Sequence, residues 1–243
     1  MESMLVRERY KVVRVIDSQE DYAFVEAVDI LDREMGGCVL NLYEGPLLRR
    51  YLPCFDRMEG CSAYQGMFLD GESLVAVFQD CGGKPIDQVF YQGDSHSWQD
   101  RLYYAGQFFQ EVLNLSDLPA DVACALLLSD NVRVDQVNRQ ICLRFHMVPM
   151  EGMNPREVAY LACDQVRKIM RPRMSSPKEE LDFLDELDQG LCANAVQFYA
   201  LWRNWGEKIQ EAYEALGKKN FVRRWCGLLV GRIKRRFTRK KRR

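Results

Sequence analysis

The side chains whose types and spacing indicate a definite chemistry lie at the C-terminal end of the chain. Residues 218–243, KKNFVRRWCGLLVGRIKRRFTRKKRR, hold thirteen Lys and Arg residues and no acid. Apolar side chains recur there at steps of three or four, which places them on one face of a helix: Phe221, Trp225, Leu228, Leu229, Ile233 and Phe237. Basic side chains lie mostly on the other faces: Arg223, Arg224, Arg232, Lys234, Arg235, Arg236, Arg239, Lys240 and Lys241. This polybasic pattern predicts binding to an anionic surface.

The residues leave the kind of anionic surface open. Aromatic and aliphatic side chains opposite Lys and Arg are typical of a helix lying on anionic lipid, at ~1 kcal/mol per basic residue. Alternatively, residues 221–230 pack on the body as a last helix and only 232–243 are exposed. An Arg-rich tail also binds nucleic acid non-specifically or docks on an acidic protein surface. Residues 1–217 hold 21 basic and 35 acidic side chains, and this acidic body disfavours DNA.

No other stretch carries a recognisable catalytic or cofactor motif. The sequence lacks G-x-S-x-G, P-loop, H-E-x-x-H and G-x-G-x-x-G patterns. His96 lies in a polar loop and is predicted to be solvated, and with His146 as the second of two histidines a Cys/His metal site is not expected. The nine cysteines form no C-x-x-C pair and several lie in apolar runs, which predicts buried, reduced thiols. We therefore predict no cofactor and no metal.

Composition places the chain among cytoplasmic globular proteins. Its 243 residues are 47% hydrophobic, enough for one large or two small cores. The N-terminal MESMLVRERYKV is charged and lacks the apolar region of a signal peptide. No run approaches the ~20 apolar residues of a membrane span. The expected location is the cytoplasm, peripheral at the cytoplasmic membrane face if the tail binds lipid.

Strands dominate the first third of the chain. Five runs rich in β-branched and aromatic residues predict strands: 9–16, 22–30, 38–43, 62–70 and 72–80. The gaps between the first three are short and polar, which indicates an antiparallel meander, and a D-G pair between the last two is a strong hairpin signal. Residues 46–58 predict at best a short or broken helix, because Pro53 interrupts them.

The remainder of the chain is mostly helical in pattern. Residues 98–115 place apolar side chains at helical spacing, and 155–172 and 177–216 also predict helices. Ser176 begins a Ser-x-x-Glu capping box. Between these helices, residues 125–145, ALLLSDNVRVDQVNRQICLRF, predict two short strands on a turn. Strands at the front and helices behind predict an α+β fold.

This order of elements resembles a protein kinase, and the local sequence resembles bacterial Ser/Thr kinases. RYKVVRVI is similar to the opening strand, VFQDCGGKPIDQVF to the last small-lobe strand with its hinge, and ADVACALLLSDNVRVDQVNRQICLRF to the catalytic loop and metal-binding hairpin. The likeness is one of pattern and order. It implies a five-stranded antiparallel N-lobe at 9–80, a hinge and reduced helical C-lobe at 81–216, and a basic tail at 217–243. The alternative is an unrelated α+β domain.

The small-lobe positions that handle phosphate in kinases have lost their chemistry here. The turn at residues 17–22 matches the glycine-rich loop, yet it has no glycine and carries three carboxylates that repel a triphosphate. The strand lysine falls on Asn41, which brings no charge. The helix glutamate that orients this lysine is missing, with Asp56 a weak substitute.

The large-lobe positions have changed in the same way. If Asn131 matches the metal-binding Asn, the catalytic base falls on Leu126 and the magnesium carboxylate of D-F-G falls on Arg144. Asn131 is the one matching residue, although S-D-N is also ordinary turn chemistry. The stretch from Phe145 to Pro155 is too short for an activation segment.

These departures predict a pseudokinase, a catalytically inactive scaffold that recognises an unidentified protein partner, at a membrane surface through the basic tail. One alternative is a divergent, active Ser/Thr protein kinase. A second is a nucleic-acid-binding protein that acts through the tail.

Overall fold

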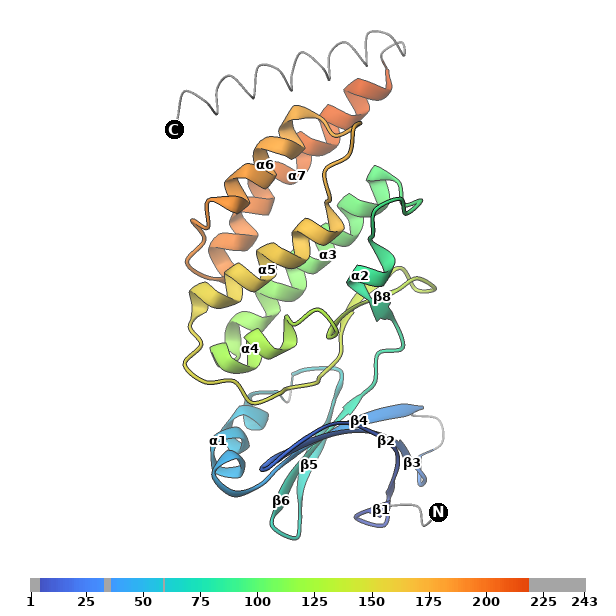
Figure 1. The fold of residues 1–243 in the computed structure, drawn as a ribbon, viewed down its shortest axis with the longest axis vertical. Helices are drawn as coiled ribbons and strands as arrows, with labels where there is room; N and C mark the ends of the chain where they lie inside the picture. Colours follow the sequence, from blue (N-terminus) through green and yellow to red (C-terminus); the bar gives the residue numbers. More distant parts are fainter. Residues whose placement is uncertain (1–4, 33–35, 59, 219–243) are drawn as a thin grey trace.

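The computed structural model describes residues 5–32, 36–58 and 60–218. They form two lobes, with a β-sheet and one helix below and a group of helices above (Figure 1). Residues 219–243 of the basic tail predicted at 217–243 lie outside the described residues, so the lipid-binding helix stays a prediction.

An antiparallel sheet of six strands forms the small lobe. Its strands are β1 (Leu5–Val6), β2 (Tyr10–Gln19), β3 (Tyr22–Asp29), β4 (Gly37–Tyr43), β5 (Tyr64–Asp70) and β6 (Ser73–Gln79). They lie in the order β1-β2-β3-β4-β6-β5. The predicted strand count of five was too low, because the two-residue β1 pairs only with the start of β2 at the edge of the sheet. A strand this short leaves no periodic signal in the sequence.

Tight turns set the register of this sheet. Gln19 pairs with Tyr22, so the turn that matches the glycine-rich loop is only two residues long. Asp70 pairs with Ser73 across the predicted hairpin, where Gly71 takes a φ of +61° that favours glycine.

Helix α1 (Gly45–Phe55) packs beside β4 and β6 in the small lobe. The prediction of a short or broken helix was wrong, because α1 is continuous over 11 residues. Pro53 lies in its last turn, where the bond that an N–H would donate to the Arg49 carbonyl is lost but the helix ends two residues later. Pro46 occupies the first turn, which proline favours because N–H groups there have no helical partner.

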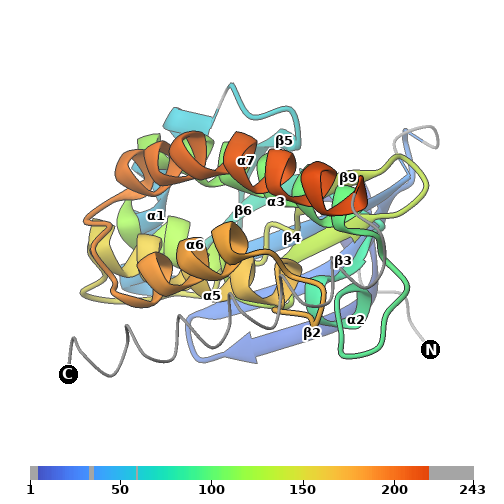
Figure 2. The same ribbon diagram turned by 90° about the horizontal axis from the view of Figure 1, so that it is seen from above.

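The large lobe is built mainly of helices. They are α2 (Ile86–Val89), α3 (Trp98–Asn114), α4 (Ala120–Leu126), α5 (Pro155–Ile169), α6 (Lys178–Asp188) and α7 (Ala195–Gly217), with a short 3₁₀ turn at Leu115–Asp117. Another 3₁₀ turn, Asp56–Met58, follows α1 in the small lobe. Figure 2 shows α7 running alongside α3 above the sheet, and these two helices are in contact. The predicted helical region 177–216 is divided in two, because the chain turns through Gly190 at a φ of +61°.

Side-chain caps begin three of these helices. Ser97 with Asp100 forms a capping box on α3, and Asn154 with Glu157 forms one on α5. Asn194 accepts from the backbone N–H of Gln197 at the start of α7. The predicted capping box at Ser176 was wrong, because its hydroxyl instead accepts from the backbone N–H of Arg173 at 2.9 Å.

A three-stranded sheet, ordered β7-β8-β9, lies where the lobes meet. Its strands are β7 (Lys84–Pro85), β8 (Val132–Asp135) and β9 (Gln140–Leu143), so the predicted hairpin is confirmed. Val134 pairs with Ile141 rather than with Leu143, which pairs with Val132. Residues 80–83, here called the linker, connect β6 to β7. A Cβ on Gly83 would lie 2.7 Å from the Val134 backbone, so only glycine lets the linker approach the hairpin this closely.

One buried apolar cluster runs through both lobes. It joins Phe24 and Phe78 of the small sheet to Phe145 and to the helices of the large lobe. A second, smaller cluster covers the other face of the sheet. Over the described part of the chain, no helix combines the length and apolar character that crossing a bilayer requires.

Candidate functional site

The space between the lobes is crossed by residues 144–147, here called the interlobe segment. Its backbone is bound by side chains of the small sheet. Asn41 donates from Nδ2 to the Phe145 carbonyl at 2.8 Å and accepts from the Met147 N–H at 3.0 Å. Tyr22 donates its hydroxyl to the Asn41 amide oxygen at 2.9 Å. The position that matches the kinase lysine therefore holds two lobes together with neutral hydrogen bonds.

Two ring stacks fill the same space. Phe145 stacks on Phe78 of β6, with 4.5 Å between ring centroids, and His146 stacks on Phe24 of β3 at 4.1 Å. Such pairs stabilise a packed core beyond the burial of their area. The side chains of the interlobe segment thus lie against the underside of the small sheet, where they are buried or nearly so.

Arg144, the first residue of the interlobe segment, forms ion pairs with two acids. Its guanidinium binds Glu26 of β3 through Nη2 and Asp80 of the linker through Nε at 3.2 Å, and it lies over the Phe24 ring. The Arg144 side chain is only 7% exposed, so its charge is balanced by these carboxylates rather than by water. Arginine suits this place because its planar fork reaches two acids at once.

The ionisation of these groups follows their surroundings. Hydrogen bonding from Arg14, and then from Arg144, holds the pKa of Glu26 below its usual value. Burial raises the pKa of Asp80 despite the opposing charge of Arg144. Burial lowers the pKa of His146, although Asp17 lies 3.4 Å from its Nε2 and acts in the other direction. His146 therefore stacks on Phe24 mainly as the neutral imidazole.

Asn131 and Leu126 are structural in the large lobe. Asn131 is 1% exposed and donates from Nδ2 to the carbonyls of Ala125 and His146, at 2.7 and 2.8 Å. Leu126 is fully buried at the end of α4. The asparagine that matches a metal ligand thus anchors the interlobe segment from below, as Asn41 does from above.

Helix α1 also connects the lobes. Arg50 binds Asp121 of α4 and the Met150 carbonyl through Nη2, and Glu151 through Nη1 at 3.1 Å. Asp56, the weak substitute for the kinase glutamate, lies exposed beyond the end of α1. In this chain α1 therefore contributes an ion pair between the lobes.

The structure brings most of the predicted positions together. Asn41, Asn131 and Arg144 all contact or belong to the interlobe segment, whereas Leu126 lies in the core of the large lobe. Within the described ranges, no group of three or more His, Cys, Asp and Glu side chains is arranged to hold a metal ion. The basic and apolar tail residues 221–241 lie outside those ranges.

The thiols are more exposed than predicted. Cys38, Cys54, Cys124 and Cys163 are buried as free thiols, but four others are partly exposed: Cys61, Cys81, Cys142 and Cys192. His96, predicted to be solvated, packs against the Phe90 ring instead, at 4.9 Å between centroids.

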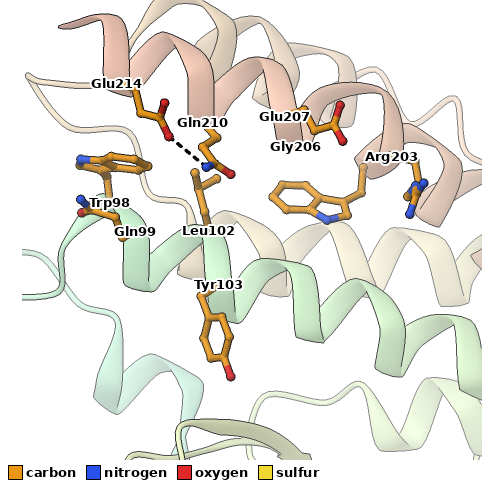
Figure 3. A pocket seen from close by; sticks show the side chains of 10 residues that line it. Trp98, Gln99, Leu102, Tyr103, Arg203, Gly206, Glu207, Gln210 and Glu214 are labelled. Atoms are coloured by element: carbon orange, nitrogen blue, oxygen red, sulfur yellow. Dashed lines mark hydrogen bonds between the residues drawn. The ribbon is translucent and has the colours of Figure 1, made fainter. Parts of the chain in front are cut away.

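A groove between α3 and α7 is a second candidate site (Figure 3). It has a volume of about 560 Å³. Aromatic and aliphatic side chains from Trp98, Leu102 and Trp202 line it together with the carboxylates of Glu207 and Glu214. Arg203 also lines the groove, so the lining offers apolar contact and a net negative charge of one to a ligand.

Trp202 shapes that groove. Its ring stacks on Phe109 at 4.9 Å and meets Phe183 edge-on at 5.9 Å. A Cβ on Gly206 would lie 3.2 Å from the indole, so glycine makes room for the ring. The indole thus ties α3, α6 and α7 together at the floor of the groove.

Comparison with solved structures supports a protein-kinase-like fold. The kinase domain of PknI from Mycobacterium tuberculosis, solved as a double mutant, has a similar fold with a TM-score of 0.53 at 13% sequence identity. The alignment covers 88% of this chain and 98% of that domain. No family model matches the sequence, and the search of curated proteins found no match. The chain therefore has a protein-kinase-like α+β fold.

Sequence reasoning missed three features of the site. It did not find the Arg50–Asp121 ion pair, the stack of His146 on Phe24, or the groove at Trp202. Each joins residues far apart in the chain, and a single sequence contains no signal for such pairings.

Proposed function

We propose that this protein is a catalytically inactive, kinase-like recognition module that acts as a scaffold. One observation supports the proposal: the residues predicted to match the phosphate- and metal-handling positions of kinases bind the lobes to each other. Asn41 and Asn131 hold the interlobe segment, and Arg144 is paired with two acids.

The physical argument concerns charge. Phosphoryl transfer depends on cations near the phosphates, carboxylates that hold magnesium, and a base near the acceptor hydroxyl. Asn41 is neutral, Leu126 has no proton to exchange, and Arg144 places a cation where a metal carboxylate is required. Asp17, near His146, adds a negative charge to the same region.

A nucleotide-binding assay tests this proposal. We expect millimolar ATP, with or without Mg²⁺, to leave the thermal midpoint unchanged, because no cation of the described site is free to hold the phosphates. A ligand at 100 times its Kd adds about 2.7 kcal/mol, which raises the midpoint of a chain this size by roughly 5–10 °C. A Mg²⁺-dependent rise of that order, with transfer of labelled γ-phosphate that is lost in Asn131→Asp, would establish the divergent-kinase alternative instead.

The groove between α3 and α7 supports recognition of a protein partner. Its aromatic rings give the buried apolar contact that dominates protein interfaces. Its carboxylates, Glu207 and Glu214, complement a partner segment that bears basic side chains. Because the groove lies on the large lobe, away from the interlobe segment, such binding does not require the lobes to move apart.

We further propose that the basic tail holds the protein at the cytoplasmic face of a membrane. The apolar face that begins at Phe221 and the Lys and Arg residues around it support this placement. In vesicle sedimentation at 0.1 M salt, we expect binding to vesicles with 30% phosphatidylserine and at least tenfold weaker binding to neutral vesicles. Replacing Arg232, Lys234, Arg235 and Arg236 by Gln should abolish the difference. Salt-dependent binding to duplex DNA without vesicle binding would favour the nucleic-acid alternative.

A further inference from the structure

Two thiols meet where the linker between the lobes passes the β8–β9 hairpin. Cys81 lies in the linker after β6, and Cys142 lies on β9, and both are partly exposed. Pairing of β7 with β8 and of β8 with β9 brings the linker against this hairpin. The Cys81 and Cys142 thiols interact with each other, and both line one cavity.

The two sulfur atoms have different surroundings. Interaction with Cys81 lowers the pKa of Cys142 against the effect of burial. The same interaction, followed by burial, raises the pKa of Cys81. Since a thiolate is the nucleophile in disulfide exchange, we assign Cys142 as the attacking sulfur and Cys81 as the second thiol.

Both thiols line a cavity of about 920 Å³ at the junction of the lobes. Its walls come from the connection between α1 and β5, the linker, the end of α3 and strand β9. Cys61 belongs to the first of these, the connection between α1 and β5. Four acids line it: Asp80, Glu111, Asp117 and Asp135. Asp80 is already paired with Arg144, and Arg57 is the one basic side chain among the described lining residues, so the other three acids favour a cationic ligand.

We propose that Cys81 and Cys142 form a thiol–disulfide exchange site for a small disulfide that carries positive charge. The Cys142 thiolate attacks one sulfur of the small disulfide, which forms a mixed disulfide and releases one thiolate. Cys81 then gives up its proton to solvent and attacks the Cys142 sulfur, which releases the second thiol. The protein dithiol is oxidised by two electrons, and the small disulfide is reduced to two thiols.

The bond has a mechanical consequence that is independent of the proposed loss of catalysis. Cys81 directly follows Asp80, and Cys142 precedes Arg144 by two residues. Asp80 and Arg144 form an ion pair between the linker and the interlobe segment. A disulfide beside this pair fixes the linker to the hairpin and so to the segment that binds the small lobe.

Oxidation by disulfides of different charge tests the site on the full chain. The probes are cystamine, which is cationic, hydroxyethyl disulfide, which is neutral, and dithiodipropionate, which is anionic. We expect a peptide that links Cys81 to Cys142 by mass spectrometry, formed fastest with cystamine and about tenfold slower with dithiodipropionate at low salt. The difference should shrink as salt screens the acids. Equal rates, or the reverse order, would contradict the charge selectivity and with it the proposal.

Three variants identify the roles of the sulfurs. Cys81→Ser should accumulate the mixed disulfide on Cys142, whereas Cys142→Ser should lose the link and slow the reaction of Cys81 at least tenfold. Cys61→Ser is the matched control in the same cavity, and it also resolves the mapping, since Cys61 and Cys81 share the tryptic peptide 58–101. Oxidation that starts at Cys61, or unchanged kinetics in Cys142→Ser, would overturn the assignment.

Discussion

Arg144→Ala is expected to destabilise the protein by about 3 kcal/mol, the cost of breaking a buried ion pair by removing one partner. The substitution leaves Glu26 and Asp80 facing each other without their shared cation. Their carboxylates are only about a quarter exposed, so water compensates the lost charge poorly. The thermal midpoint should fall by roughly 6–12 °C in calorimetry.

A matched control separates this pair from ordinary surface charge. Arg14 binds the same Glu26 at 2.8 Å, but its side chain is 63% exposed. Arg14→Ala should leave the midpoint almost unchanged, because solvent screens exposed pairs. Removing the stranded carboxylates with Glu26→Gln and Asp80→Asn should restore part of the stability of Arg144→Ala. If Arg14→Ala costs as much as Arg144→Ala, the interlobe role of Arg144 is wrong.

Asn41→Leu is expected to have an effect of similar or greater size, about 4 kcal/mol. Asn41 is fully buried and makes three hydrogen bonds, to Tyr22, Phe145 and Met147. A leucine, which has the same branched shape but is larger and apolar, leaves a hydroxyl, a carbonyl and an N–H buried without partners, each at about 1–3 kcal/mol. Urea unfolding at constant m-value measures the loss.

Tyr22→Phe measures how much one of the three hydrogen bonds of Asn41 contributes to stability. It removes one of the three hydrogen bonds and keeps the ring that packs on Tyr43, so we expect a loss of about 1 kcal/mol. Asn41→Lys, which introduces the residue predicted at this position in a kinase, should destabilise at least as much as Asn41→Leu, because it places a charge in a fully buried site that is built for a neutral amide. A Lys variant that is both stable and bound by ATP would show that the lobes retain an open nucleotide site.

Local patterns in the sequence were enough to predict the order of the elements. Alternation in residues 22–30 and 38–43 marks strands, and the period of 98–115 marks a helix, because each depends on side chains near in the chain. The same patterns failed where local rules compete. β1 is too short to produce a period, and Pro53 is tolerated in the last turn of α1. The Ser176 hydroxyl accepts a hydrogen bond from the Arg173 backbone N–H instead of capping α6.

The candidate site was also predictable from the sequence only in part. The loss of glycine, lysine, base and metal carboxylate could be predicted by aligning Asn41, Leu126 and Arg144 with a kinase pattern. The hydrogen bonds and ion pairs that these residues form could not be predicted from the sequence. The pairing of Cys81 with Cys142 was equally hidden, since only the contact of the linker with the hairpin brings the two thiols together.

The sequence by itself determined the α+β order of elements and the acidic body with its basic tail, and it predicts that the charged groups of kinases are missing. Only the tertiary structure decided that Arg144 meets Glu26, 118 residues away, and Asp80, 64 residues away. Asn41 likewise finds Phe145 and Met147 only when the lobes close on one another. The physical reason is that periodicity reports on neighbours along the chain, whereas the partners of a buried charge or amide depend on which distant segments cross it.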